Sequence, residues 1–205
     1  MAKVAETNDL DVFRDIDRRQ LPVLDVGPAL SGNKQAIHKL ADKWREVWES
    51  IGFMCIVNHG ISNELIKSME KEAKRFHDLP IDEKMNVYIT TDQKGYSPGY
   101  SSLTTHSEFH ERKKLDNVEA YVIATDYADD NPNVIAGESF YGKMPWLPEE
   151  VLPGFRSASE KYMKTITALG KKLLPVWALS LDLKEDFFKP ILKFFPIYYS
   201  YIIVS

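Results

Sequence analysis

The segment His106-Ser107-Glu108-Phe109-His110 has the residue types of a metal site. It spaces two imidazoles and a carboxylate two residues apart, so in an extended strand all three side chains would lie on one face. Two histidines and one carboxylate are ligands that suit Fe(II). The flanking residues, Thr104-Thr105 and Arg112-Lys113-Lys114, are instead typical of a polar loop without the rigid support that a metal site needs. We expect a solvated loop, with a metal site as the alternative hypothesis.

The other histidines and the single cysteine favour structural roles. His59 follows an apolar run in a tight turn, where its ring is expected to find a backbone partner. His77 falls near the end of a predicted helix, where a cationic ring is favoured without any function. His38 is expected on the solvent-exposed face of its helix. Cys55 lies inside the apolar run Phe53-Met54-Cys55-Ile56-Val57, which predicts a strand buried on both faces and an unreactive thiol.

Two further patterns could be mistaken for sites. The segment Gly95-Tyr96-Ser97-Pro98-Gly99-Tyr100 is not a phosphate-binding loop, because it lacks both the Lys-Ser/Thr ending and a strand-to-helix setting. Asp116 and Glu119 could form a pair of catalytic carboxylates. Charged residues at the start of a strand are, however, usually solvated or ion-paired. We therefore predict no catalytic residue from either pattern.

Three amphipathic helices and several short strands are predicted to position these residues. Apolar residues recur at helical spacing from Ile37 to Ile51, after an N-cap in Ser31-Gly32-Asn33 and before a left-handed Gly52. A second helix is predicted from Ser62 to a residue before Pro80, and a third from Pro148 or Pro153 to Ser180, where Pro175 should kink the helix or end it early. Strands are predicted at Leu21–Asp25, Phe53–Val57 and Ala120–Ala124, with long loops at Thr91–Lys114 and Thr125–Pro145.

The composition is that of a folded globular chain. Its 205 residues are 44% hydrophobic with a net charge of −4, which excludes wholesale disorder and gives no reason to expect nucleic acid as a partner. One cysteine excludes an internal disulfide and any zinc site built on two thiolates. The polar start lacks a secretory signal, and the apolar stretch at residues 191–204 is too short and too interrupted to span a membrane. We expect a cytoplasmic protein without a membrane partner.

A series of short motifs, in order along the chain, resembles the N-terminal region of the isopenicillin N synthase-like oxygenases. These are non-haem Fe(II) enzymes, mostly dependent on 2-oxoglutarate. The similarity runs from about Leu21 to about Pro190 and rests on Leu21–Asp25, Gly52-Phe53, Asn58-His59-Gly60-Ile61, Phe76, Leu79-Pro80, Glu83-Lys84, Gly95-Tyr96 with Gly99-Tyr100, Asp116 with Glu119, and Trp146 with Leu152-Pro153-Gly154-Phe155-Arg156.

The resemblance implies an α+β fold in which an N-terminal helical layer covers the first strands of a double-stranded β-helix, or jelly-roll, with an incomplete barrel. It divides the chain into a polar arm at residues 1–20, the dioxygenase N-terminal region at 21–190, and a divergent apolar tail at 191–205. The tail is either the start of the first barrel strand or unrelated out-of-frame sequence. The resemblance also implies that Tyr96 or Tyr100 lies near the substrate mouth; the alternative is that these rings pack on the helices.

The motifs that hold the cofactors in that family are missing from these residues. The family binds iron through a His-x-Asp pair and a distant His, and binds 2-oxoglutarate through Arg-x-Ser. The histidines here are His38, His59, His77, His106 and His110, and the sequence contains neither His-x-Asp nor Arg-x-Ser. We therefore expect no catalytic, metal or cofactor residue in this chain, although Fe(II) and 2-oxoglutarate are the cofactors that the family implies.

Three hypotheses about function follow. The first is a role in Fe(II)/2-oxoglutarate-dependent oxidation of a small organic molecule by hydroxylation, desaturation or cyclisation, as in secondary metabolism, with this chain inactive alone. The second is a truncated, non-catalytic remnant or interaction module. The third is a metal protein that uses His106, Glu108 and His110. The largest apolar side chains of the helices are Trp44, Trp48, Phe76, Tyr162 and Trp177. Without a barrel several of these aromatic side chains would stay partly exposed to water, which predicts marginal stability, or a partner or a second copy of the chain that covers the exposed apolar face.

Overall fold

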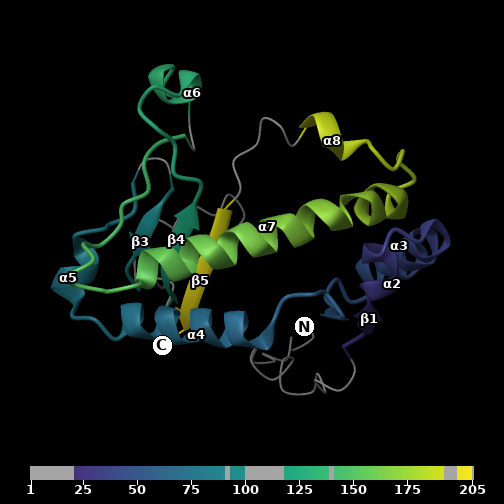
Figure 1. Cartoon of the computed structure of the whole chain (residues 1–205), viewed down its shortest axis with the longest axis horizontal. Helices are drawn as coiled ribbons and strands as arrows, with labels where there is room; N and C mark the ends of the chain where they lie inside the picture. The colour runs from purple at the N-terminus through teal and green to yellow at the C-terminus, as the bar shows by residue number, and fades with distance from the viewer. Residues whose placement is uncertain (1–20, 91–92, 100–117, 139–140, 192–197, 205) are drawn as a thin grey trace, which may run out of the picture. The chain divides into compact units, whose positions relative to one another are not determined.

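The computed structural model describes residues 21–90, 93–99, 118–138, 141–191 and 198–204. Its helices and strands (Figure 1) confirm an α+β chain, and they divide between two compact units. The first unit contains residues 1–60 and 169–190, and the second contains residues 61–168 and 191–205. Helix α7 (Phe155–Ser180) contributes its first part to the second unit and its last part to the first.

The first unit packs a helix against two short parallel strands. Strand β1 (Val23–Asp25) pairs with β2 (Cys55–Val57), with Leu24 opposite Ile56. The chain between them forms α2 (Gly27–Leu30) and α3 (Lys34–Glu49), and α8 (Phe188–Ile191) begins near the end of the unit. The buried core consists of Leu24, Val26, Leu40, Ala41, Trp44, Val47, Leu173 and Val176.

Helix α3 forms as its sequence predicts. The side chain of Asn33 accepts a hydrogen bond from the Ala36 N–H at 3.1 Å and caps the first turn. After the helix, Gly52 has a φ of +73°, which glycine adopts without strain. Arg45 reaches from the middle of α3 to the end of α7, where its guanidinium donates to the carbonyl oxygens of Leu179 and Ser180. Both ends of the predicted helix are confirmed to within a few residues.

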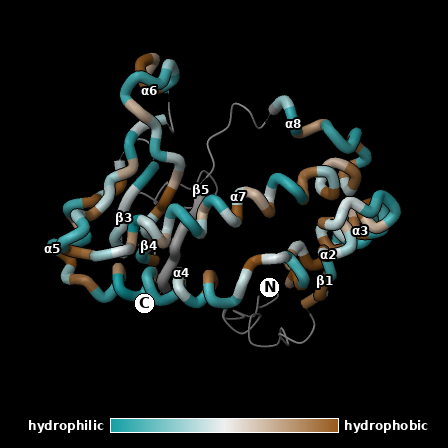
Figure 2. Tube along the Cα trace, in the orientation of Figure 1, coloured by the Kyte–Doolittle hydropathy of each residue, from teal (hydrophilic) through white to brown (hydrophobic). Residues whose placement is uncertain are grey.

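The second unit packs helices on a three-stranded antiparallel sheet. Helices α4 (Asn63–His77) and α5 (Ile81–Met85) precede β3 (Gly95–Ser97) and β4 (Val118–Ala124), and β4 lies between β3 and β5 (Tyr198–Val204) in Figure 1. Short α6 (Pro132–Ile135) follows β4. Along α4, short hydrophobic stretches recur within a mostly hydrophilic helix (Figure 2). Phe76 of α4 stacks on Phe155 of α7 and contacts Tyr121 of β4, with ring centroids 5.4 and 4.4 Å apart.

Three local predictions need correction. Strand β2 is not buried on both faces and Cys55 is exposed, because a two-stranded sheet presents only one face to the core. Helix α7 does not end early at Pro175; Leu173 and Val176 on either side of it are core residues, and their burial outweighs the roughly 3 kcal/mol that an internal proline costs. The region predicted as the first long loop contains strand β3.

The apolar tail does form a strand, since β5 pairs with β4 along Tyr198–Val204. In the described ranges the five strands form one two-stranded and one three-stranded sheet and no closed barrel, so a jelly-roll stays a prediction. The expected exposure of several large aromatic residues is confirmed by Trp48 and Trp177, whereas Trp44 and Phe76 are buried. Among the described helices, none combines the length and apolar character needed to cross a membrane.

Candidate functional site

The structure describes only part of the residues that the sequence singles out. Tyr96 lies on β3. Tyr100, His106, Glu108 and His110 lie outside the described residues, so the metal hypothesis for this segment stays a prediction. Within the described ranges, no three His, Cys, Asp or Glu side chains are grouped so that they could hold a metal ion. The candidate site is therefore built around Tyr96.

The Tyr96 ring is buried in the core of the second unit. It packs edge-on against Phe76, with ring centroids 5.9 Å apart, and the Lys84 ammonium lies 5.4 Å from its centroid. Burial, together with a hydrogen bond to Glu119, raises the pKa of the Tyr96 hydroxyl well above its usual value. The ring thus packs on the helices, which was the alternative to a substrate contact. A role at a substrate mouth stays a prediction.

The carboxylate of Glu119 contacts the polar groups that surround Tyr96. Its Oε1 accepts a hydrogen bond from Lys84 Nζ at 2.5 Å and lies 3.1 Å from His77 Nδ1. The Lys84 ammonium also donates to the carbonyl oxygen of His77 at 2.9 Å. The side chains of Lys84 and Glu119 are only 8% and 20% exposed, so water competes little with these bonds. We refer to His77, Lys84, Tyr96 and Glu119 as the Glu119 cluster.

The electrostatics of the cluster favour an ionised carboxylate. Burial acts to raise the pKa of Glu119, but hydrogen bonds from Lys84, His77 and Tyr96, with the positive charge of Lys84, outweigh burial and lower it. A buried carboxylate with several donors and a buried ammonium satisfy one another. The arrangement can hold elements in place, but it contains no activated nucleophile.

Each member of the cluster comes from a different element. His77 is the last residue of α4, Lys84 lies in α5, Tyr96 in β3 and Glu119 in β4. Because side chains alternate along a strand, Glu119 lies on the same face of β4 as Tyr121, which is paired with Tyr96. The cluster therefore ties two helices to strands β3 and β4 of the sheet.

Sequence reasoning treated Glu119 as solvated or paired and His77 as a residue without a function. The pairing of Glu119 is confirmed, but its partners were not predicted. One signal was available: Glu119, Tyr121 and Ile123 alternate on one face of β4, and both apolar members are buried. An acidic residue on the buried face of β4 needs a buried cation as its partner. The sequence alone does not show which of the lysines of the chain is that partner.

A second buried cation was also missed. The ammonium of Lys94 donates to the carbonyl oxygens of Thr125 at 2.7 Å and Gly142 at 2.6 Å, and it lies 5.0 Å from the centre of the Tyr127 ring. Lys94 is fully buried. It joins the chain just before β3 to both ends of the segment between residues 125 and 142, so this long connection is fixed at its base.

Known proteins share this region of sequence. The family model described as "non-haem dioxygenase in morphine synthesis N-terminal" matches residues 21–149. Azadirone synthase LFS of Melia azedarach is 38% identical over 152 residues, which cover 74% of this chain and 44% of that protein. A 2-oxoglutarate-Fe(II) type oxidoreductase of Aspergillus fumigatus is 30% identical over 172 residues, covering 83% of this chain and 50% of that protein. The chain spans about half the length of the curated relatives it matches.

Solved structures share the fold. Full-length Neurospora crassa T7H in complex with alpha-KG superimposes with a TM-score of 0.63 at 23% identity, covering 82% of this chain and 49% of that chain. The dioxygenase for auxin oxidation 1 from Arabidopsis thaliana, in complex with 2-oxoglutarate, gives 0.54 at 22% identity, covering 89% and 57%. At such identities the likeness concerns the fold alone.

Proposed function

The chain belongs to the non-haem dioxygenase family whose N-terminal model matches residues 21–149, and from this premise we propose that it forms the N-terminal scaffold of an Fe(II)/2-oxoglutarate-dependent oxygenase. The observation that carries the proposal is that match, which covers both β1 and the whole Glu119 cluster. Relatives are named 2-oxoglutarate-Fe(II) oxidoreductases, so Fe(II) and 2-oxoglutarate are the cofactors of the family. The substrate class that we propose is a small organic molecule.

Within this scaffold, the Glu119 cluster and Lys94 have positioning roles. The cluster fixes Tyr96 between α4, α5 and β4, and Lys94 fixes the segment that begins at Thr125. A rigid first layer is what an oxygenase needs in order to keep residues of a site in place. In this proposal residues 21–190 form one functional region. Of the two tyrosines that the resemblance assigns to the substrate mouth, Tyr96 is buried, so Tyr100 is the residue that we propose lines the approach to substrate.

The residues of this chain do not fit the binding of the family cofactors. Fe(II) in such enzymes needs two imidazoles and a carboxylate on one face, and 2-oxoglutarate needs a guanidinium backed by a hydroxyl. The sequence holds no His-x-Asp and no Arg-x-Ser. We therefore propose that these 205 residues are inactive alone.

Anaerobic titration tests this part of the proposal. Fe(II) and 2-oxoglutarate are added to the purified chain, and the metal-to-ligand charge-transfer absorbance of a ternary complex is recorded. We expect no band. A band at one equivalent per chain contradicts the proposal, and its loss in His106→Ala but not in His38→Ala would assign the metal to the His106–His110 segment.

The oxygenase role has a separate test. The transcript beyond codon 205 is read in all frames, where we expect His-x-Asp, a later His and Arg-x-Ser. Their absence in every frame contradicts the oxygenase role. That result would favour the second candidate function, a non-catalytic interaction module. The exposed side chains of Trp48 and Trp177 in the first unit support this candidate.

A further inference from the structure

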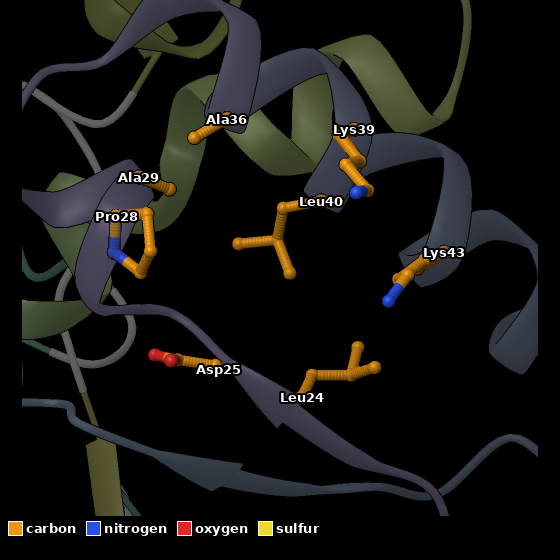
Figure 3. A pocket seen from close by; sticks show the side chains of 8 residues that line it. All are labelled: Leu24, Asp25, Pro28, Ala29, Ala36, Lys39, Leu40 and Lys43. Carbon is orange, nitrogen blue, oxygen red and sulfur yellow. The ribbon is translucent and has the colours of Figure 1, made fainter.

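A hollow of about 190 Å³ opens in the first unit (Figure 3), and none of its lining residues belongs to the Glu119 cluster. Strand β1 and helices α2 and α3 form its walls. Its apolar floor contains Leu24 and Leu40, whose side chains are buried, with Ala29 beside them. Lys39 and Lys43 stand along one side of it (Figure 3). The hollow thus joins an apolar surface to a pair of cations.

The two lysines have the same charge on the same face of one helix. Residues four apart in a helix are neighbours, so two ammonium groups at this spacing repel each other. Neither lysine makes an ion pair or a hydrogen bond within the part of the chain that the structure describes. An anion between them would remove this repulsion.

The one acidic residue that lines the hollow does not neutralise the lysines. Asp25 Oδ1 accepts a hydrogen bond from the N–H of Gly27 at 2.9 Å, which holds the turn into α2. In Figure 3 its carboxylate is directed away from Lys39 and Lys43. The positive side of the hollow is therefore open to an external anion.

We propose that this hollow binds a small organic acid. Its carboxylate lies between Lys39 and Lys43, and its hydrocarbon part covers Leu24 and Leu40. A cavity of about 150 Å³ accommodates benzene, so a hollow of about 190 Å³ suits a body of about six to eight non-hydrogen atoms. The site belongs to the first unit alone and does not depend on the proposed oxygenase role.

Hexanoate is a suitable probe, and binding to the 205-residue chain is followed by ¹H–¹⁵N NMR. We expect saturable shifts at the amides of Leu24 and Leu40. Because exposed ion pairs are weak, Lys39→Gln or Lys43→Gln should each weaken binding roughly threefold, and the double variant roughly tenfold. Lys39→Arg should retain binding, and Lys34→Gln, on the same helix but outside the hollow, should leave it unchanged.

Inorganic phosphate separates the proposed ligand from a simple anion. It carries charge without a hydrocarbon body, so we expect it to bind more weakly than hexanoate. Three results would each overturn the proposal: no saturable shift with hexanoate, equal hexanoate binding by the double variant, or phosphate binding as tight as hexanoate binding. Shifts centred on residues outside the hollow would overturn it as well.

Discussion

Glu119 is the residue on which the polar contacts of the second unit converge. One of its oxygens serves both Lys84 and His77, and Tyr96 donates to the same carboxylate. The buried ammonium of Lys84 would lose its counter-charge if Glu119 were neutral. At the residue scale, this carboxylate therefore decides whether α4, α5 and the sheet stay joined.

Replacing Glu119 by Gln should lower the free energy of unfolding by about 2–3 kcal/mol. The amide keeps the shape but leaves the Lys84 ammonium without a negative partner. The value lies below that for a fully buried pair, because the Glu119 side chain is 20% exposed. Urea denaturation followed by circular dichroism measures the change. Glu150→Gln, at an exposed position of the same unit, should shift stability by less than about 0.5 kcal/mol; equal midpoints for the two variants would contradict the role of Glu119.

The same carboxylate gives stability a pH dependence. The pKa of Glu119 is lowered in the folded chain, whereas the pKa of an unfolded Glu is about 4.3. Its contribution is therefore complete above about pH 5 and is lost as the pH falls through the folded pKa. We expect the difference in urea midpoint between the original chain and Glu119→Gln to be large at pH 7 and to shrink towards pH 3. A difference that is constant over this range would show that charge is not the cause.

At the element scale, β3 depends on a close backbone approach at Gly95. Its φ is +111°, and a Cβ at this position would lie 2.6 Å from the carbonyl oxygen of Val87 and 2.9 Å from Pro145 Cγ. Backbone atoms cannot move aside as a flexible side chain can. The Gly95-Tyr96 pair is therefore fixed by geometry: the first residue allows the strand to approach, and the second fills the core.

Gly95→Ala should destabilise the chain by about 2–4 kcal/mol, through strain at positive φ and the clash with Val87. Thermal unfolding measures it as a lower Tm. Gly99→Ala is the matched control, because a Cβ at Gly99 meets nothing within 4 Å and its φ is not positive. That variant should leave Tm unchanged or raise it slightly. If both alanine variants unfolded at the same temperature, the close approach at Gly95 would not matter.

The elements that could be predicted from sequence are those with strong local signals. The stripe from Ile37 to Ile51 and the cap at Asn33 define α3 without reference to the rest of the chain. Strand β3 has only three residues in a Gly- and Ser-rich stretch, and it exists because β4 pairs with it. The exposure of Cys55 could not be predicted either, because an apolar run does not reveal how many strands its sheet will have.

The candidate site was predicted even less completely, for the same reason. Tyr96 was singled out from a motif, but its partner Glu119 is 23 positions away in sequence, and the Lys84–Glu119 pair joins residues 35 positions apart. Buried cations such as Lys84 and Lys94 look like any surface lysine in the sequence. Only the packing of the second unit distinguishes them.

At the scale of the whole molecule, the first unit presents an exposed aromatic surface. Trp48 and Trp177 are 47% and 44% exposed, and their rings lie 5.8 Å apart. Leu181 beside them is exposed as well, and together these side chains border an apolar hollow of about 200 Å³. Apolar groups gathered in this way favour association between molecules.

We expect the chain to self-associate through this surface as its concentration rises, which sedimentation velocity measures. Leu181→Ser should weaken association roughly tenfold, as expected for one large aliphatic group lost from an interface. Ile135→Ser is the control, since Ile135 lies on α6 of the second unit, is 73% exposed and does not line this hollow. Association that is equally weakened by both variants, or a chain that stays monomeric at every concentration, would contradict the expectation.

Helix α7 has a consequence for how the chain matures during translation. The first unit needs Leu173 and Val176 to complete its core, yet the ribosome adds them only after residues 61–168, most of the second unit, have been made. The apolar faces of strand β1 and helix α3 therefore stay uncovered while more than a hundred further residues emerge from the ribosome. A chaperone that protects nascent chains would find its longest window there, between the synthesis of Gly60 and that of Val176.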